Sequence, residues 1–292
     1  MNRLRALFDG PVVLADGAWG TQFQLRGLRP GEPADLWNLT RPDDVTAVGR
    51  AYVEAGSQVI LTNTFRANPI ALAAQNAADR MVPINVAGVS LSREAAGTRA
   101  RVFASIGPSG VMLAAGEISP EDVEASFLAQ AEALASAGPD ALLLETFSDI
   151  DEARLALRAA RSTGIPVLVS FAFDSGRGRD RTMTGATPEQ VGEAMAEAGA
   201  DGVGANCGNG PESFATVGRR LAASGLPLWL KPNAGLPVIE GTAVRYSMTA
   251  DQFASYAPEL VASGALFIGG CCGTNPSMIC ELGRAISSCV SS

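Results

Sequence analysis

The chain has 292 residues, of which 47% are apolar and 18% are charged, and its formal net charge is −8. This balance is typical of a compact soluble protein and excludes an intrinsically disordered one. The net negative charge argues against nucleic-acid binding, which needs clustered Lys and Arg, and no apolar run approaches the length of a membrane span.

The N-terminal sequence and the cysteine count indicate the redox compartment. Residues 1–17 lack the long apolar region and the cleavage pattern of a secretory signal peptide. Five cysteines, an odd number, then point to reduced thiols and a cytoplasmic location. In such a compartment the natural roles to consider for the cysteines are metal binding and catalysis.

Eight short apolar segments recur along the chain at fairly even spacing. They cover residues 11–17, 57–64, 101–108, 140–147, 166–173, 201–207, 227–233 and 264–271. Most are continuous runs of Val, Ile, Leu, Phe and Ala, as expected for parallel strands that are buried on both faces.

Helical stretches with clear start and stop signals separate these strands. Residues 119–138 open with Ser-Pro-Glu and 187–200 with Thr-Pro-Glu, and each ends near a glycine. Residues 249–264 have Thr249 as a cap, a proline inside and a glycine at the end. Eight strand–helix units favour an α/β fold of the (β/α)8 TIM-barrel type over a doubly wound sheet. No linker divides the chain, so we expect one domain over residues 1–292.

The barrel prediction places the polar residues that follow the strands on one rim. Active sites of such barrels lie at the carboxyl ends of the strands. The residues at these ends are Asp16, Asn63, Thr64, Glu145, Thr146, Asn206, Cys207, Asn233, Cys271 and Cys272. Three of the five cysteines are therefore expected to converge.

The three rim cysteines predict a zinc site. Catalytic zinc has three protein ligands and one open position, and soft thiolates favour zinc over magnesium or calcium. Cys207, Cys271 and Cys272 would supply these ligands in a chain without histidine. The glycines around the adjacent pair, at 269, 270 and 273, would let both sulfur atoms turn inward. A strained vicinal disulfide, a Cys207–Cys271 disulfide or three structural thiols are the less favoured alternatives.

The remaining two cysteines are expected to lie away from the rim. Cys280 falls in the predicted last helix and Cys289 in the tail, both as structural or incidental thiols.

A three-thiolate zinc site favours one kind of chemistry. Such a site carries about one net negative charge by formal counting, and an incoming thiol would lose its proton on binding. The bound thiolate stays nucleophilic, whereas a hydrolase would rather use histidine ligands that keep zinc electrophilic toward water. The site therefore predicts attack of a thiolate on a carbon electrophile.

Motifs along nearly the whole chain resemble one family, the zinc-dependent homocysteine S-methyltransferases. That family includes the homocysteine-binding module of cobalamin-dependent methionine synthase and betaine–homocysteine methyltransferase. The matching segments are LADGAWGTQ, VILTNTFRAN, ASIGPSG, LLLETFSDIDEARLAL, GANCGNGP, KPNAGLP and GGCCGTNP. The resemblance implies a (β/α)8 barrel and zinc ligands at Cys207, Cys271 and Cys272.

The resemblance also implies an amino-acid pocket. Asp16 and Glu145 would lie near the substrate ammonium, and backbone amides of residues 16–21, including Gly17 and Thr21, near its carboxylate. Asn233 resembles a rim residue that hydrogen-bonds near zinc. From the residues alone, Asp16 could equally be a turn residue, Glu145 a helix-start charge and Asn233 a turn residue.

These inferences predict an enzyme that methylates L-homocysteine to L-methionine. The donor would be a small onium compound, S-methylmethionine or betaine, or a separate methyl-corrinoid protein, because no folate or cobalamin module follows the barrel motifs. The alternatives are a non-catalytic zinc- or thiol-binding barrel and methyl transfer to another small thiol or selenol.

Two further features stay open between function and structure. Residues 174–185, rich in Gly and Arg, are either a lid or docking surface or, more simply, a solvated loop. Trp19 and Phe65 are either an aromatic wall for an onium donor or ordinary core residues.

Overall fold

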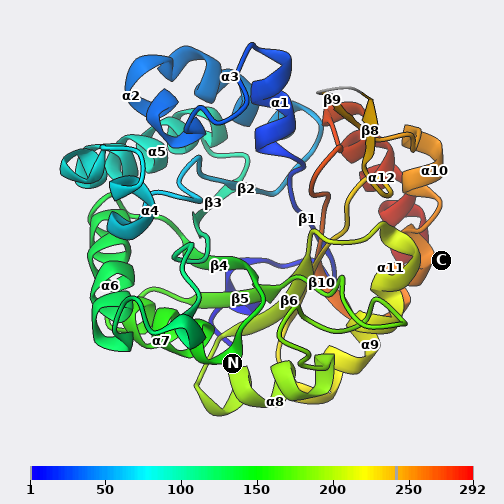
Figure 1. Ribbon diagram of the computed structural model, residues 1–292. Helices are drawn as coiled ribbons and strands as arrows, with labels where there is room; N and C mark the ends of the chain where they lie inside the picture. Colours follow the sequence, from blue (N-terminus) through cyan, green and yellow to red (C-terminus); the bar gives the residue numbers. More distant parts are fainter. Residues whose placement is uncertain (1, 241–242, 292) are drawn as a thin grey trace.

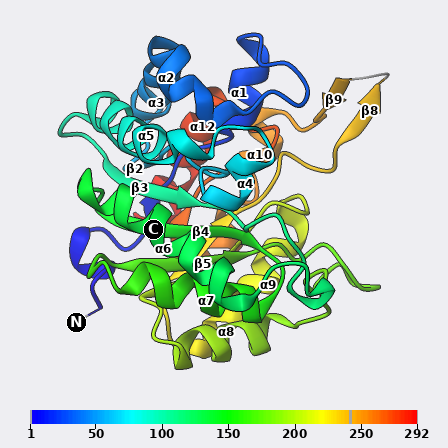
Figure 2. The same cartoon turned by 60° about the vertical axis from the view of Figure 1, so that its left-hand side comes forward.

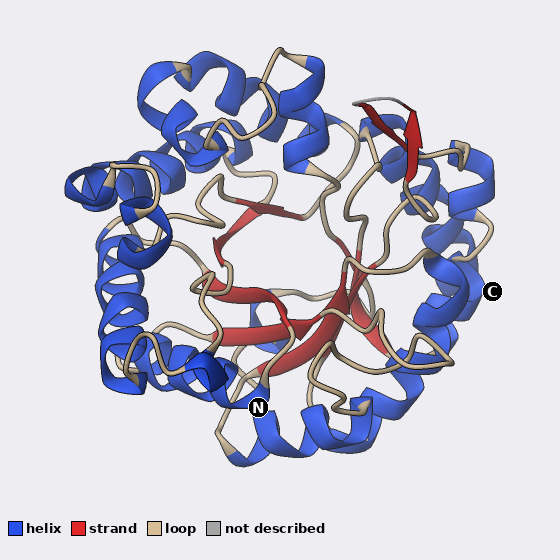
Figure 3. Cartoon of the chain, viewed as in Figure 1, coloured by secondary structure: helices blue, strands red, loops and turns tan. Residues whose placement is uncertain are grey.

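A closed ring of parallel strands, surrounded by helices, forms the structure (Figure 1), a computed structural model that describes residues 2–240 and 243–291. The eight strands of the ring are β1 (Val13–Leu14), β2 (Val59–Leu61), β3 (Arg101–Ile106), β4 (Ala141–Phe147), β5 (Val167–Phe171), β6 (Gly202–Asn206), β7 (Leu228–Lys231) and β10 (Ala265–Ile268). Figure 3 shows these strands at the centre with the helices outside them. The predicted (β/α)8 barrel is confirmed.

The order of the strands closes the barrel. The sheet runs β1-β10-β7-β6-β5-β4-β3-β2, and every pairing in it is parallel. A parallel bridge between Ala15 and Val59 joins the first strand to the second. Each strand is shorter than its predicted segment, because the chain turns into a loop soon after it leaves the hydrogen-bonded ladder. β7 lies between β6 and β10, so it separates the two cysteine-bearing strands.

The helices alternate with the strands, as the sequence predicts. They are α1 (Trp19–Leu25), α2 (Trp37–Thr40), α3 (Pro42–Glu54), α4 (Pro69–Ala73), α5 (Met81–Ala96), α6 (Pro120–Ser136), α7 (Ile150–Arg161), α8 (Pro188–Glu197), α9 (Phe214–Leu221), α10 (Ala250–Ala254), α11 (Ala257–Ala262) and α12 (Pro276–Val290). Ser119 caps α6, and Thr187 and Thr249 form capping boxes at α8 and α10. Among the described residues, no helix combines the length and the apolar character that a membrane crossing requires.

Three details differ from the sequence predictions. The stretch 249–264 forms two helices, α10 and α11, because Pro258 has no amide hydrogen to bond to the Ala254 carbonyl, so the helix is interrupted after Ala254. Cys289 lies inside α12 and not in a tail, since this helix continues to Val290. An antiparallel hairpin of β8 (Val238–Glu240) and β9 (Ala243–Arg245), which was not predicted, projects from the barrel (Figure 2).

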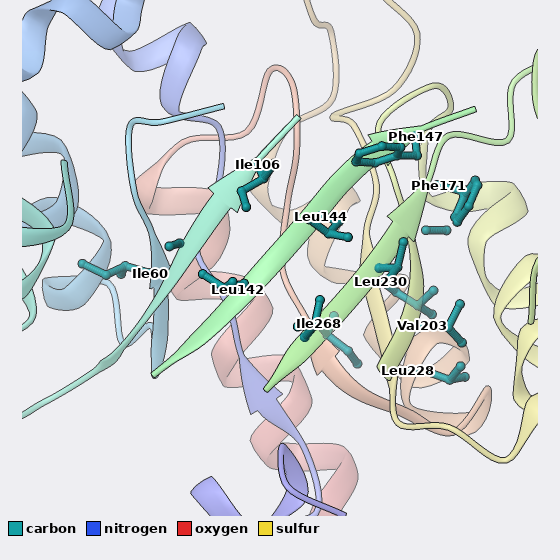
Figure 4. Close-up of a cluster of buried hydrophobic side chains, with 14 of the residues drawn as sticks. Ile60, Ile106, Leu142, Leu144, Phe147, Phe171, Val203, Leu228, Leu230 and Ile268 are labelled. Carbon is teal, nitrogen blue, oxygen red and sulfur yellow. The ribbon is translucent and has the colours of Figure 1, made fainter. Parts of the chain in front are cut away.

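Two apolar cores hold the barrel together. The larger one lies between strands and helices, and Figure 4 shows its strand side, with Leu142, Leu144 and Leu230 among the labelled residues. The smaller one fills the barrel interior. Its aromatic side chains are Phe103, Trp229 and Phe267, with Phe8 packed against them. These four rings, which we call the aromatic floor, fill the interior beneath the carboxyl ends of the strands.

Candidate metal centre and active site

Three thiols meet at the carboxyl ends of β6 and β10. The Sγ atoms of Cys207, Cys271 and Cys272 all lie within 4.8 Å of one another, and the Cys207 and Cys272 sulfur atoms are 3.8 Å apart. All three residues are half-buried. The predicted convergence of these cysteines is therefore present in the fold.

The last residue of β7 and the residue after it hold both cysteine loops in place. On one side, the Cys207 amide donates to the Lys231 carbonyl at 3.2 Å. On the other side, the Cys271 amide donates to the Pro232 carbonyl at 2.7 Å. One short segment therefore fixes the spacing between a sulfur from β6 and two sulfurs from β10.

The turn that directs the first thiol inward is made by the cysteine itself. Cys207 has φ 63°, in the left-handed region, and Gly208 follows with φ 73°. A non-glycine residue in this region carries strain that commonly marks functional sites. Of the glycines around the adjacent cysteines, Gly273 has φ 81°, whereas Gly269 serves close packing. A Cβ at Gly269 would lie 2.6 Å from the Asp16 carbonyl oxygen.

Asparagine side chains surround the sulfur atoms. Asn206 is buried, and its Nδ2 lies 3.9 Å from the Cys271 sulfur and donates to Thr146 Oγ1 at 2.6 Å. Its Oδ1 accepts from the Thr146 amide and the Ser170 hydroxyl. The sequence places Asn206 on the rim without assigning it a contact, and the fold makes it a support for Cys271.

The three thiols differ in pKa. Hydrogen bonds from Cys271 and Cys272, with a smaller contribution from Asn233, lower the pKa of Cys207 to about 3. The same hydrogen bonding to Cys207 raises the pKa of Cys271 and the pKa of Cys272. Of the three thiols, Cys207 therefore loses its proton most readily. Binding a metal would displace the remaining protons.

The cluster fits a zinc ion. Two sulfur atoms bound tetrahedrally at about 2.3 Å lie about 3.8 Å apart, which is the separation between Cys207 and Cys272. Three thiolates form a soft donor set, and the chain has no histidine. Asn233 adds a buried Oδ1 that has no hydrogen-bond partner among the described residues.

Asp16 lies in the same mouth, but its carboxylate is fully engaged by the protein. Trp19 Nε1 and the Leu61 amide donate to its Oδ2 at 2.6 and 2.8 Å. Lys231 Nζ donates to its Oδ1 at 2.5 Å. The Asp16 side chain is 0% exposed and the Lys231 side chain 3% exposed. This buried ion pair was missed from the sequence.

A signal for this pair was present in the composition. Lys231 is the one lysine in the whole sequence, and it stands at the end of a predicted strand beside Asn233. Because β7 alternates, Lys231 points the same way as Trp229, two residues earlier, and its Nζ lies 5.4 Å from the Trp229 ring centroid. The ammonium therefore lies directly above the aromatic floor.

Glu145, at the end of β4, is the more accessible acid. It is half-buried, and the Ser105 hydroxyl donates to its Oε1. Burial raises the pKa of Glu145, and the charges of Asp16 and Cys207 raise it further. Lys231 and the Ser105 hydrogen bond act in the opposite direction. Glu145 precedes Thr146, which is hydrogen-bonded to Asn206 beside the Cys271 sulfur, so Glu145 lies in the same mouth as the thiols.

The segment 16–21 packs against the loop that carries the cysteine pair. Thr21 Oγ1 accepts from the Gly273 amide at 3.1 Å, and Thr274 Oγ1 accepts from the Ala18 amide at 3.0 Å. A Cβ at Gly17 would lie 2.8 Å from Thr274 Oγ1. α1 begins within this segment, at Trp19, and its N-cap residue Ala18 makes no side-chain cap hydrogen bond.

The other rim residues have structural contacts. Asn63 Nδ2 donates to the Ala34 carbonyl and to Asn38 Oδ1, and the Thr64 hydroxyl donates to the Ser105 carbonyl. Among the described residues, neither Asn63 nor Thr64 is hydrogen-bonded to a thiol.

The aromatic candidates and the arginine-rich loop also pack within the fold. Trp19 is bound to Asp16, and a Cβ at Gly107 would lie 2.6 Å from Phe65, which shows how closely Phe65 is packed. Arg177 and Arg179 in the loop 174–185 are exposed. Two hydrogen bonds from Asn209 Nδ2, to the carbonyls of Phe173 and Arg179, tether this loop.

Comparisons with known proteins agree on one family. A family model described as homocysteine S-methyltransferase matches residues 13–286. Methionine synthases of Mycobacterium leprae and Mycobacterium tuberculosis are each 30% identical, over 95% and 94% of this chain. The matched regions are 24% and 25% of those proteins, so the chain spans about a quarter of the length of these relatives.

Solved structures agree with this result. The metallated form of the Escherichia coli homocysteine methyltransferase MmuM is 28% identical, with a TM-score of 0.80, over 97% of this chain and 99% of that one. A methyltransferase from Methanosarcina mazei, 12% identical with a TM-score of 0.63, shares the fold over 98% of this chain and 97% of its own.

Proposed function

The chain belongs to the homocysteine S-methyltransferase family, and from this premise we propose that it methylates the thiol of L-homocysteine to give L-methionine. The observation that carries the proposal is the cluster of Cys207, Cys271 and Cys272, with Glu145 in the same mouth. A thiol-binding centre and an amino-acid pocket together suit a thiol-containing amino acid.

We propose zinc as the ion held by the three cysteines. When bound, zinc supplies an open coordination position at which an incoming thiol loses its proton. Asn206 and Asn233 hold the cysteine sulfurs through their side-chain amides. Such outer contacts fix ligand orientation and tune the charge on the sulfur.

The pocket orients the rest of the substrate. Glu145 gives the mouth a negative charge that suits the substrate ammonium, and Asp16, paired with Lys231, lies in the same mouth. The amides at the start of α1, next to Gly17 and Thr21, suit its carboxylate. Held at both ends, the acceptor thiol can face a methyl donor for in-line displacement, so that proximity and orientation supply much of the acceleration.

The donor belongs to one of two classes. One is a small onium compound, S-methylmethionine or betaine, and the other is a methyl-corrinoid carried by a separate protein. The E. coli homocysteine methyltransferase matches over its whole length, whereas the curated relatives are methionine synthases several times longer. We treat residues 1–292 as one barrel domain, and place it in a reducing, cytoplasmic compartment because the thiols must stay reduced.

A donor screen tests the proposal. Zinc-loaded protein and L-homocysteine are incubated with S-methylmethionine, betaine, methylcobalamin or a methylated corrinoid protein, and methionine is measured. We expect methionine from at least one donor and none from Cys271→Ala protein. Homocysteine binding without methionine from any donor would favour a non-catalytic barrel, and turnover with another small thiol or selenol alone would change the acceptor.

A further inference from the structure

The one lysine of this chain is buried against Asp16, an acid that the family resemblance places near the substrate ammonium. Lys231 Nζ lies 2.5 Å from Asp16 Oδ1, and both side chains are almost fully buried. This contact joins residues 215 positions apart in the sequence. A buried ion pair is costly to assemble, so its presence at the mouth needs a reason beyond stability.

Asp16 has little capacity left for a substrate. Its carboxylate accepts three hydrogen bonds from Trp19, Leu61 and Lys231, and the side chain is 0% exposed. An ionised carboxylate offers about four acceptor positions, so at most one remains, with no exposed surface.

Glu145 differs from Asp16 in both respects. It is half-buried, and the one side-chain hydrogen bond to it that the structure records comes from Ser105. It stands on the opposite part of the ring, on β4, and still senses Lys231, Asp16 and Cys207 electrostatically. Of the two acids, Glu145 therefore has the capacity to receive a cation from solution.

We propose that Lys231 is an internal ammonium that occupies Asp16, so that the amino group of the acceptor is recognised by Glu145 and not by Asp16. This inference rests on the proposed function and makes Lys231 the neutralising partner of Asp16, which leaves Glu145 as the acid that recognises the amino group. Asp16, Lys231 and ionised Glu145 sum to one negative charge, which matches one substrate ammonium. Two uncompensated acids would instead repel each other and favour protonation of one.

The position of Lys231 on the aromatic floor supports a fixed role. Its stem lies inside the barrel, and its ammonium faces the Trp229 ring at 5.4 Å. A ring face attracts a cation, so Trp229 and Asp16 hold the ammonium from two sides. The same carboxylate anchors the Leu61 amide of β2, so the pair ties together β1, β2 and β7 beneath the pocket.

A binding comparison tests which acid recognises the amino group. Calorimetry measures the affinity of zinc-loaded protein for homocysteine and for 4-mercaptobutanoate, which has the same thiol and carboxylate but no amino group. We expect the preference for homocysteine to fall roughly tenfold or more in Glu145→Gln. In the double variant Asp16→Asn/Lys231→Met, which removes both charges of the pair, we expect that preference to stay within about threefold of wild type.

A loss of preference in the double variant as large as in Glu145→Gln would overturn the inference, because Asp16 would then contact the amino group. A second measurement uses wild-type protein and avoids folding defects. Lysine labelled with 15N at Nζ gives one side-chain signal, which we expect to keep slow hydrogen exchange when homocysteine binds. A signal that moves to fast exchange would show that the substrate displaces Lys231, and would contradict the inference.

These readouts are separate from the test of the proposed function. Absence of methionine with every donor contradicts the methyltransferase proposal. The ligand preference and the lysine signal decide the role of Lys231 whether or not turnover occurs.

Discussion

The barrel mouth has a thiol half, formed by Cys207, Cys271 and Cys272, and an acid half, formed by Asp16 and Lys231. The two halves differ in how many hydrogen bonds and ion pairs the protein itself provides to them. In the thiol half, three sulfur atoms rely mainly on one another, with an amide contact as long as 3.9 Å. In the acid half, Asp16 accepts three hydrogen bonds between 2.5 and 2.8 Å and is fully buried. The thiol half could therefore hold a cation from solution, whereas the acid half already contains its own cation, Lys231.

This difference predicts separate responses to perturbation. Changes in the thiol half should alter metal content and turnover while the barrel stays folded. Changes in the acid half should alter the free energy of unfolding, because they leave a buried charge without a partner. Changes at Glu145 should alter the preference between ligands, with smaller effects on metal content and on the free energy of unfolding.

The largest expected effect is on the thiol half. Replacing Cys271 with Ala removes one of three ligands, and we expect loss of stoichiometric zinc and a fall in methionine formation of about a thousandfold or more. Metal analysis and initial rates measure these two quantities. Cys280→Ser is the matched control, because Cys280 lies in α12 away from the cluster, and it should keep both. Full activity of zinc-free protein would refute the zinc proposal.

The next largest effect is on the acid half. Asp16→Asn leaves the Lys231 ammonium buried without its carboxylate, and we expect the free energy of unfolding to fall by about 3–5 kcal/mol. Urea denaturation with and without zinc measures this change. The exposed pair of Arg50 and Glu94 provides the control, and Arg50→Gln should change stability by less than about 1 kcal/mol. Equal effects in the two variants would mean that burial of the Asp16 pair has no special cost.

A smaller effect on zinc binding is expected for Asn206, whose side-chain amide contacts the Cys271 sulfur. Asn206→Ala removes the side-chain amide near the Cys271 sulfur and the contacts to Thr146. Loss of such outer contacts typically weakens metal affinity by about 10–100-fold, so zinc should bind more weakly but still bind. Competition with a chelator measures the affinity. Unchanged zinc affinity would show that the contact is incidental.

The smallest effect is the pH response of Glu145. Its pKa is raised above 4.5 by burial, so acidification protonates it at a higher pH than an exposed glutamate. The preference for homocysteine over 4-mercaptobutanoate should decline as pH falls through that raised value, and Glu145→Gln should abolish this decline. A group with a raised carboxyl pKa stabilises the folded state as pH falls, so the stability difference between wild type and Glu145→Gln should change in the opposite direction. A pH-independent preference in wild type would contradict the role of Glu145.

The barrel and the thiol cluster could both be predicted from the sequence, and for the same physical reason. Eight buried strand segments predict the ring, and the ring brings the ends of β6 and β10 to one mouth, so Cys207 and Cys271 meet without further information. The hairpin of β8 and β9 escaped notice because each strand has three residues, too few for a periodic pattern. The split of 249–264 into two helices was foreshadowed by its proline, but the exact break depends on tertiary packing.

The Lys231–Asp16 pair could not be predicted from local pattern. It depends on the closed register that brings β7 and β1 to opposite sides of β10, across 215 positions of sequence. Composition alone gave a hint, because a single lysine placed on a strand is unlike a solvated surface residue. Only the side-chain geometry shows that Lys231 pairs with Asp16 and not with Glu145.

The burial of the one lysine also gives the protein a chemical reporter of its own. An amine-directed reagent meets no lysine side chain on the surface, so every modified lysine must be Lys231, reached while the mouth of the barrel is open. The labelling rate would then measure how often the native state opens at this point, as amide exchange does for backbone groups. A ligand that seals the mouth should slow that rate in proportion to its occupancy.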